Sequence, residues 1–479
     1  MVRTVAAALL LALAVAALPP RAHAQSWPET CGTHGPFDFD TYEALDSRGT
    51  YNLAIQLAAE GKFFTAPYRT PAGETVDFSY PGVEQGPRGA RLPPDPSVRV
   101  PPTIVRSIVW VESSYQMASG SVPWGGVGPA LRSFDCGFGL GQVTTGMANT
   151  TGTPSAKQVL SGTHFVFNLA ESVRILVSKW NAAPEYRPVA GTGDPAALED
   201  WYFAIWSYNG FAWSNHPLNP ERDPWRGEVY HCLDPEGPGY SWFGYGDYTY
   251  PERVYGCMRY PPKRDGQRMW EPVEFAMPRF DQPDVASAFS AENWLECALY
   301  LRCEAMDYPT TIPELGVEPH PDPSPPADPA LGAALLGTPR LAVEGPASAI
   351  LQTSPDGTSE SVTLSVRNTG AWIGPFRVRT SAPWLRVRHP NDPVGRTLDG
   401  GVAIGSETRV VVSGAQTTAG YVSVLLVDID RALQPQGVAH GTVWVEPLFG
   451  EGVPFRLDIT AVKSGALPNQ RIVIPGLAR

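Results

Sequence analysis

The character of the first half of the chain is set by one stretch, PPTIVRSIVWVES at residues 101–113. Its two prolines suit the first turn of a helix, because their missing N–H groups need no partner there. Three- and four-residue steps then place Ile104, Ile108 and Val111 on one face, together with Glu112. The stretch predicts an amphipathic helix with a carboxylate on its buried face.

Burial of a carboxyl group disfavours its charged form and raises its pKa. We therefore expect Glu112 to be protonated near neutral pH, as a general acid has to be. From the helix alone, the alternative is an ordinary glutamate near a helix end whose side chain turns into solvent.

Helical spacing of apolar residues extends over most of the chain before residue 308. We expect helices at 42–63, 103–113, 164–180 and 195–208, separated by loops rich in Gly and Pro. This pattern predicts a mainly α domain over residues 25–308.

A Pro-rich stretch at 309–339 separates this region from a different pattern. Its prolines favour an extended, semi-rigid linker. After it, Val362, Leu364 and Val366 alternate with polar residues, and about seven such short runs occupy 340–465. They predict an immunoglobulin-like β-sandwich, followed by a tail at 466–479.

Length and composition limit the classes of protein. The chain has 479 residues, 43% of them hydrophobic, which is enough for packed cores and excludes wholesale disorder. Its 36 Lys and Arg face 48 Asp and Glu, for a net charge of −12. Nucleic acid is therefore not an expected partner, since backbone binding depends on clustered cations.

The first 24 residues resemble a secretory signal peptide. Arg3 precedes an apolar run from Val5 to Leu18, and Ala22-His23-Ala24 offers a cleavage site. The alternative, a membrane anchor, needs about 20 apolar residues, more than this run supplies. Removal of the segment leaves a net charge of −14 and, by expectation, an exported chain without a membrane span.

Export makes the six cysteines candidates for three disulfides, with pairing left open. They are Cys31, Cys136, Cys232, Cys257, Cys297 and Cys303. No two of the eight histidines lie three to five residues apart, so a zinc site is not expected. No nucleotide-binding or other cofactor motif is present, and we expect neither metal nor cofactor.

Five short motifs follow one another in the first domain. They are Glu112-Ser113, Gly139-Leu140-Gly141-Gln142, Asn168-Leu169, Ser207-Tyr208-Asn209-Gly210 and Tyr250-Pro251-Glu252-Arg253-Val254. Their order resembles that of the soluble lytic transglycosylase domain of the lysozyme-like superfamily, over roughly residues 100–260. The resemblance implies a multidomain chain in which a mainly α lysozyme-like catalytic domain precedes the all-β sandwich.

The resemblance also implies a reaction. Glu112 would protonate the glycosidic oxygen between N-acetylmuramic acid and N-acetylglucosamine of peptidoglycan, then accept the proton of the muramyl 6-hydroxyl, which leaves a 1,6-anhydro end. Tyr208 resembles the tyrosine that hydrogen-bonds the acid. The other matched residues would contact sugar, and they are Ser113, Gln142, Asn209, Tyr250 and Gly139.

Several positions depart from the family pattern. Gly141 replaces a Met, Ser207 replaces an Ala, and Ser172 stands where Gly is common. An insert at about 121–135 makes the interval between Glu112 and Gln142 longer than in the family pattern. The glycines at 139 and 141 also fit a tight turn, which is compatible with close approach of a sugar.

Asp135 raises an alternative reaction. It resembles the aspartate with which goose-type lysozymes position a hydrolytic water, so a hydrolytic muramidase with Glu112 and Asp135 is a second hypothesis. A loop Asp that makes only local turn hydrogen bonds is the simpler interpretation. A third hypothesis is a cell-wall-binding or adhesive protein without activity.

Aromatic residues leave both structural and binding roles open. In the sandwich, Trp372, Trp384 and Trp444 fit either core positions or a glycan-stacking face. The oligomeric state does not follow from the sequence.

Overall fold

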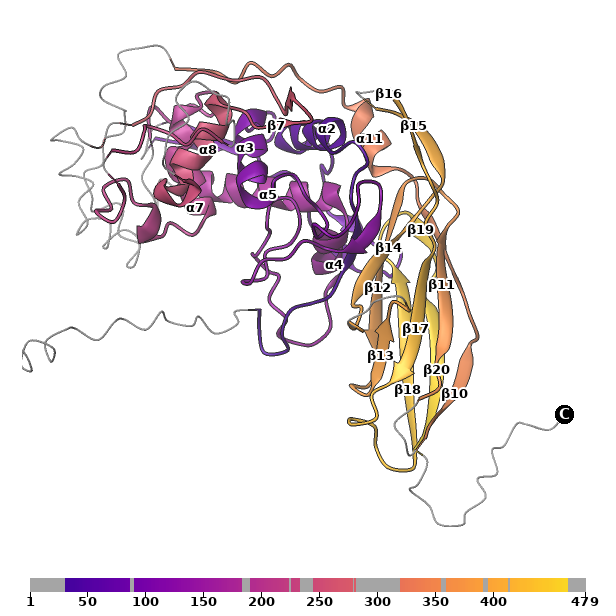
Figure 1. Ribbon diagram of the computed structural model, residues 1–479. Helices are drawn as coiled ribbons and strands as arrows, with labels where there is room; N and C mark the ends of the chain where they lie inside the picture. The colour runs from indigo at the N-terminus through magenta and orange to yellow at the C-terminus, as the bar shows by residue number, and fades with distance from the viewer. Residues whose placement is uncertain are drawn as a thin grey trace, which may run out of the picture.

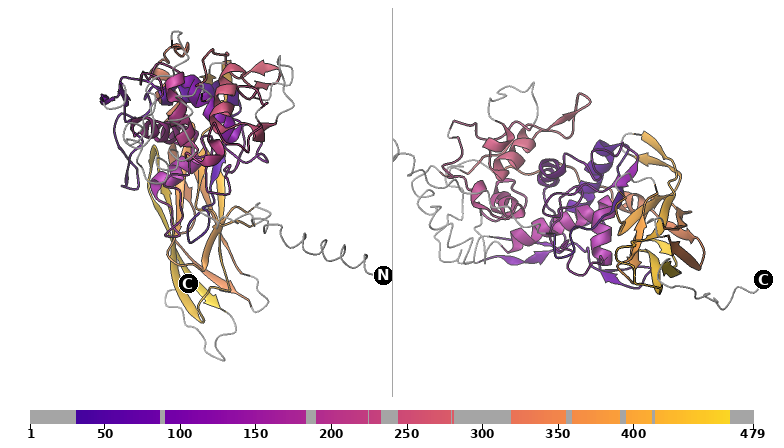
Figure 2. Two further views of the ribbon diagram at one scale, coloured as in Figure 1. Left: turned by 90° about the vertical axis from the view of Figure 1, so that its left-hand side faces the viewer. Right: turned by 60° about the horizontal axis from the view of Figure 1, so that its bottom comes forward.

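The computed structural model describes residues 31–86, 90–182, 190–223, 225–232, 244–278, 280, 319–354, 359–390, 395–411 and 414–463. Figure 1 shows two parts, a helix-containing N-terminal unit (31–280) and an elongated β-sandwich (340–463). Figure 2 shows from two further sides that the sandwich extends away from the helices. The expected signal peptide at 1–24 and the tail at 466–479 lie outside the described residues, as do Cys297 and Cys303.

The described residues of the N-terminal unit form six α-helices. They are α2 (Ser47–Ala59), α3 (Pro102–Ser113), α4 (Ala156–Thr163), α5 (Phe165–Asn181), α7 (Tyr202–Tyr208) and α8 (Tyr250–Arg259). Side-chain caps mark several starts: Asp46 accepts from the amide of Gly49 before α2, and Ser155 and Thr249 form capping boxes before α4 and α8. Apolar faces of α2, α3 and α5 meet in one core.

The N-terminal unit also contains four two-stranded antiparallel ribbons. They pair β1 (Asp40–Tyr42) with β6 (Val127–Pro129), β2 (Tyr68–Arg69) with β3 (Thr75–Val76), β4 (Val83–Gln85) with β5 (Leu92–Asp95), and β7 (Lys263–Arg264) with β8 (Gln267–Arg268). Three 3₁₀ turns, Glu199–Trp201, Trp213–Asn215 and Tyr245–Asp247, lie between the later helices.

The expected fold class is wrong. We expected a mainly α lysozyme-like domain followed by an all-β sandwich, but the described residues form seven α-helices and twenty strands, with 23% of them helical and 27% in strands. The expected helix at 195–208, for example, is a 3₁₀ turn followed by the short α7. Apolar periodicity identified α2, α3 and α5, but it missed α4 and α8 and gave no measure of the long Gly- and Pro-rich connections, which close into ribbons and turns.

The C-terminal part is a β-sandwich, as its period-two pattern predicted. One sheet has the order β10-β20-β18-β12-β14 and the other β13-β17-β11-β9-β19, and β15 pairs with β16 separately. The strands are β9 (Arg340–Glu344), β10 (Ser348–Thr353), β11 (Val362–Asn368), β12 (Ile373–Thr380), β13 (Leu385–Arg388), β14 (Gly400–Ile404), β15 (Glu407–Val411), β16 (Gly414–Thr418), β17 (Ser423–Ile429), β18 (Val438–Pro447), β19 (Glu451–Gly452) and β20 (Phe455–Lys463).

Inward side chains of both sheets form the sandwich core. Leu364, Val366 and Leu425 are fully buried there. Trp372 and Trp384 are also buried, so they are packing residues and not a glycan-stacking face, whereas Trp444 is half-buried beneath the Arg379 guanidinium.

The two parts are joined by a continuous interface. Phe39 forms a parallel bridge to Gly400, which places β1 beside the edge strand β14 of the sandwich. Trp372 packs edge-on against Tyr42 at 5.6 Å between ring centroids. The buried Arg377 of β12 reaches across to the carbonyl oxygen of Pro154 at 3.1 Å. The sandwich is therefore packed against the N-terminal unit and not merely tethered to it.

The described part of the Pro-rich segment, from residue 319 on, contacts the N-terminal unit. Its extended residues 319–329 precede the short helix α11 (Ala330–Leu336). The buried Asp322 carboxylate accepts a hydrogen bond from the backbone amide of Thr103 at 2.6 Å, at the start of α3. Pro101, the residue before α3, supplies no side-chain cap. The expected spacer thus caps the helix that carries Glu112.

Candidate active site around Glu112

Glu112 lies in the last turn of α3, where this helix packs against α8. The helix ends because Ser114 adopts a left-handed conformation, with φ of 52°. The Tyr250 hydroxyl, from the first turn of α8, donates a hydrogen bond to Glu112 Oε1 at 2.5 Å. Glu112 as a residue is half-buried, and burial of its carboxyl group has the largest effect on its acidity.

The surroundings of Glu112 change its acidity in opposing directions. Burial has the largest effect and raises its pKa to about 7, and the negative charge of Asp135 adds to this. The hydrogen bond from Tyr250 and the positive charge of Arg253 act in the lowering direction. The balance leaves Glu112 able both to donate and to accept a proton near neutral pH.

Tyr208 does not make the contact expected of it. Its hydroxyl donates to the carbonyl oxygen of Gly141 at 2.7 Å, and Tyr250 is the residue that hydrogen-bonds the acid. The two tyrosines are nevertheless close to the same carboxyl group, because the charge of Glu112 contributes to raising the pKa of both. The hydrogen bond to Glu112 that was expected from Tyr208 is therefore made by Tyr250, and Tyr208 holds the glycine-rich loop instead.

The glycine-rich loop is fixed by Asn168, which is fully buried on α5. Its carboxamide oxygen accepts from the amide of Gly141 at 3.0 Å, and its nitrogen donates to the carbonyl oxygen of Phe138 at 2.8 Å. Gly139 has a φ of 65°, and a side chain there would lie 2.6 Å from Met117 Sδ. This position requires glycine for both conformation and space.

Gly141 and Ser172 are complementary departures from the family pattern. A Cβ atom on residue 141 would lie only 1.9 Å from Ser172 Oγ, so the serine occupies the space that a side chain at 141 would need.

The remaining expected sugar-contacting residues differ in their orientation. Gln142 is partly exposed and donates to the carbonyl oxygen of Gly139 at 2.8 Å. Ser113 is buried, and its hydroxyl donates back to the carbonyl oxygen of Val109 at 2.9 Å. Asn209 is exposed at the end of α7, where its oxygen accepts from Asn215 at 2.8 Å. Gln142 and Asn209 thus remain accessible, whereas Ser113 serves its own helix.

Asp135 is exposed. Its carboxylate accepts a local hydrogen bond from Ser133 Oγ, as the simpler interpretation had it, yet its charge also reaches Glu112. The next residue, Cys136, is disulfide-bonded to Cys31. A second disulfide joins Cys232 to Cys257 in α8. One disulfide thus anchors each side of the site.

Two site residues were missed by the sequence analysis. The Arg253 guanidinium lies 4.2 Å from the centroid of the Tyr245 ring, and the Tyr245 hydroxyl donates to the carbonyl oxygen of Val111 at 3.3 Å. Arg253 stands three residues after Tyr250, so helical spacing could have placed it on the same face. Tyr245 is one of many aromatic residues in this part of the sequence, and no spacing pattern distinguishes it from the others.

Comparable proteins do not identify the chain. No known family profile and no curated protein matches it. No group of three or more His, Cys, Asp or Glu side chains suited to a metal occurs in the described part of the chain. No helix there is long and apolar enough to cross a membrane.

Solved structures show only remote likenesses. The PapD-like domain 7 of human CEP192 is 12% identical, with 26% of this chain and 86% of that chain covered and a TM-score of 0.16. The periplasmic chaperone SfaE is 13% identical over 27% of this chain and 60% of its own, with a TM-score of 0.15. A family 123 glycoside hydrolase from Clostridium perfringens is 9% identical over 26% and 27%, with a TM-score of 0.16. These scores are too low to carry a functional argument.

Proposed function

We propose that the chain is an exported enzyme that cleaves the β-1,4 bond between N-acetylmuramic acid and N-acetylglucosamine in peptidoglycan, with Glu112 as general acid and base. One observation carries the proposal: the carboxyl group of half-buried Glu112, whose pKa is raised to about 7 by burial, is held by a tyrosine hydroxyl. Carboxyl groups perturbed in this way are typical of glycosidic acid catalysis.

In the proposed reaction, protonated Glu112 gives its proton to the glycosidic oxygen as the bond from the muramyl C1 to this oxygen breaks. The resulting carboxylate then accepts the proton of the muramyl 6-hydroxyl, whose oxygen bonds to C1 and closes a 1,6-anhydro ring. Glu112 ends in its starting state, and no water is consumed. Arg253 would stabilise the transient carboxylate, since its positive charge acts on Glu112.

Hydrolysis is the second candidate because the charge of Asp135 reaches Glu112. In that reaction, Asp135 would orient a water molecule that attacks C1, and the product would carry a reducing end. Since Asp135 is exposed, water has access to it.

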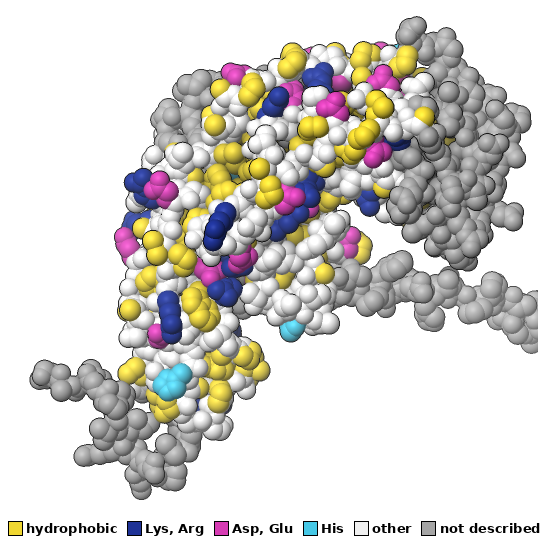
Figure 3. Space-filling view, turned by 180° about the vertical axis from the view of Figure 1, so that it is seen from behind, with side chains coloured by type: hydrophobic (Ala, Val, Ile, Leu, Met, Phe, Trp, Pro, Cys, Tyr) yellow, Lys and Arg dark blue, Asp and Glu magenta, His cyan; other side chains and the backbone are white. Residues whose placement is uncertain are grey.

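Recognition of the glycan is expected to depend on sugar contacts more than on overall charge. On the face shown in Figure 3, acidic and basic side chains lie interspersed. The net charge of −12 does not favour attraction to a polymer that itself carries carboxylates. The leader-like first 24 residues and the two disulfides support export, because disulfides persist in oxidising compartments.

The test is release of soluble fragments from purified peptidoglycan sacculi. Glu112→Gln keeps the size of the side chain but removes the transferable proton, so we expect release to fall at least about 1,000-fold. Glu228→Gln is the matched control, since Glu228 is an exposed partner of Arg259. Equal release by the wild type and the Glu112→Gln variant would contradict the proposal. Sacculus binding without release by either protein would indicate an inactive cell-wall-binding protein.

A further inference from the structure

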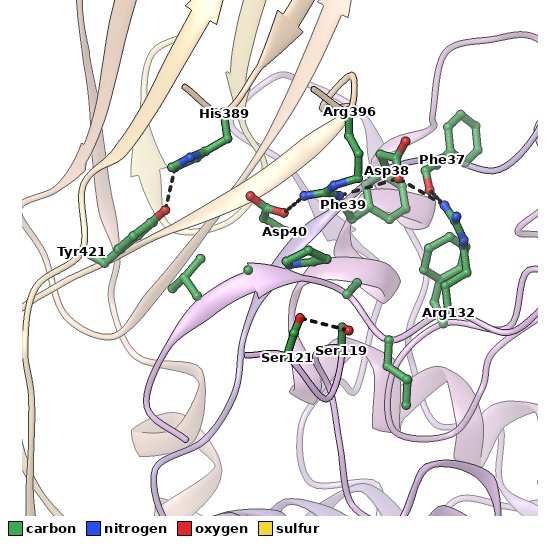
Figure 4. Close-up of a pocket in the computed structure, with 16 residues that line it drawn as sticks. Phe37, Asp38, Phe39, Asp40, Ser119, Ser121, Arg132, His389, Arg396 and Tyr421 are labelled. Atoms are coloured by element: carbon green, nitrogen blue, oxygen red, sulfur yellow. Dashed lines mark hydrogen bonds and ion pairs between the residues drawn. The ribbon is translucent and has the colours of Figure 1, made fainter. Parts of the chain in front are cut away.

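A cavity of about 630 Å³ lies between the N-terminal unit and the β-sandwich. Figure 4 shows residues of both parts facing it. His389, Arg396 and Tyr421 come from the sandwich, whereas the segments 37–40 and 127–132 come from the N-terminal unit. Its volume falls within the range of about 300–1,000 Å³ that is usual for small-molecule sites.

The polar side chains of the cavity are held in fixed orientations. His389 Nε2 and the Tyr421 hydroxyl are hydrogen-bonded at 2.9 Å, and Arg396 Nη2 contacts Asp40 Oδ1 at 3.0 Å. Arg132 Nη1 lies 3.2 Å from Asp38 Oδ1, which is also 3.6 Å from Arg396 Nη1. Such planar, mutually oriented groups offer both donors and acceptors to a ligand without further ordering.

The charges and apolar surfaces of the cavity restrict the ligand. The two carboxylates are matched by the two guanidiniums, so neither a phosphate nor a strongly cationic ligand finds an unbalanced partner among the described lining residues. Half-buried Val127, Pro129 and Leu131 provide an apolar wall. A ligand with hydroxyl groups on its rim and apolar C–H faces satisfies both features, and sugar rings have this character.

The cavity shares a wall with the Glu112 site. The segment that lines it at 127–132 continues directly to Asp135 and to the glycine-rich loop. Arg132 and Phe138 form a bridge within this wall, and Phe138 lines the cavity while its carbonyl oxygen is held by Asn168. One continuous segment therefore lines the cavity and includes Asp135, whose charge acts on Glu112.

We propose that this cavity is a second saccharide-binding site, which holds an uncharged stretch of amino-sugar glycan through its sugar rings. This inference rests on the proposed function, since it takes the same polymer as ligand. Two sites on one polymer raise the effective concentration of glycan at Glu112. The sandwich would thereby favour long strands over short fragments.

The test uses the full chain with Glu112→Gln, which prevents turnover, and chitotetraose, an uncharged tetramer of N-acetylglucosamine, in calorimetric titration. The pocket variant combines His389→Ala with Tyr421→Phe, because these two side chains contact each other within the sandwich. His440→Ala is the control, since His440 lies on β18 and bonds only Thr460 in the described residues. We expect two tetramers per chain for the parent and the control, and at least about a tenfold loss of affinity at one site for the pocket variant. A thermal unfolding midpoint equal to the parent's shows that the variant is folded.

Ala130→Trp is a second pocket variant for the same titration, since a large side chain on the cavity wall should block the same site. Binding of both tetramers by either folded pocket variant, with affinities equal to the parent's, would overturn the inference. The proposed function is tested separately by fragment release with the unmodified chain. If Glu112→Gln abolishes fragment release but the pocket variants bind chitotetraose like the parent, the proposed second site is wrong and the proposed function stands.

Discussion

Removal of the Tyr250 hydroxyl is the sharpest perturbation of the proposed acid. In the structure this hydroxyl donates to Glu112 Oε1 and lowers the pKa of Glu112, against burial. A hydrogen bond to a charged group is worth about 1.5–3 kcal/mol, and a tenfold change in acidity corresponds to about 1.4 kcal/mol. Tyr250→Phe should therefore make Glu112 a weaker acid by about one to two powers of ten.

The assay is the pH dependence of kcat/KM for fragment release. Activity needs protonated Glu112, so it falls as the pH rises through the pKa, which is about 7 in the wild type. For Tyr250→Phe, we expect the midpoint of this alkaline limb to move to about pH 8–9, with kcat lowered about 10- to 100-fold because the carboxyl is less well oriented.

Tyr208→Phe is the matched control for this experiment. Its hydroxyl donates to Gly141 and not to Glu112, so the alkaline limb should stay where it is, whatever happens to kcat. An alkaline limb at the same pH in the wild type and in Tyr250→Phe would refute the account of how Glu112 is tuned.

Three further predictions concern stability. Burial raises the pKa of Glu112 from 4.5 to about 7, so the folded wild type loses stability as the pH rises through this interval. Urea unfolding should show Glu112→Gln to be more stable than the wild type by up to about 3 kcal/mol at pH 8, and by little at pH 4. Asp322→Ala should lower the free energy of unfolding by about 1 kcal/mol, because the start of α3 loses its cap. The thermal unfolding midpoint should fall accordingly, and an unchanged midpoint would show that the cap does not stabilise the fold. Replacement of Cys31 and Cys136 by Ser should lower the free energy of unfolding by about 2–5 kcal/mol, because the disulfide closes a loop with a sequence separation of 105. Equal urea midpoints for the wild type and the double variant would contradict this.

The sequence predicted the parts of the fold that follow from local periodicity. The α3 helix and the β-sandwich appear where their spacing of 3.6 and two residues placed them, because each buries one face. The helical character of residues 25–308 was overestimated, since Gly- and Pro-rich connections have no period from which ribbons such as β4–β5 could be inferred.

The candidate site was predicted in its elements but not in all its contacts. The raised pKa expected for Glu112 follows from its place on the apolar stripe, and the structure supplies the partners. Which tyrosine reaches Glu112 depends on how α7 and α8 pack, and this is a tertiary property. The cap from Asp322 was also beyond local patterns, because its partner Thr103 lies 219 residues earlier.

The central claim is tested most directly by mass spectrometry of the fragments that the unmodified chain releases from purified peptidoglycan. Transfer of the muramyl 6-hydroxyl proton to Glu112 predicts fragments that end in 1,6-anhydro-N-acetylmuramic acid, 18 mass units lighter than hydrolytic products because no water is added. Fragments with free reducing ends would contradict this account and favour hydrolysis with Asp135.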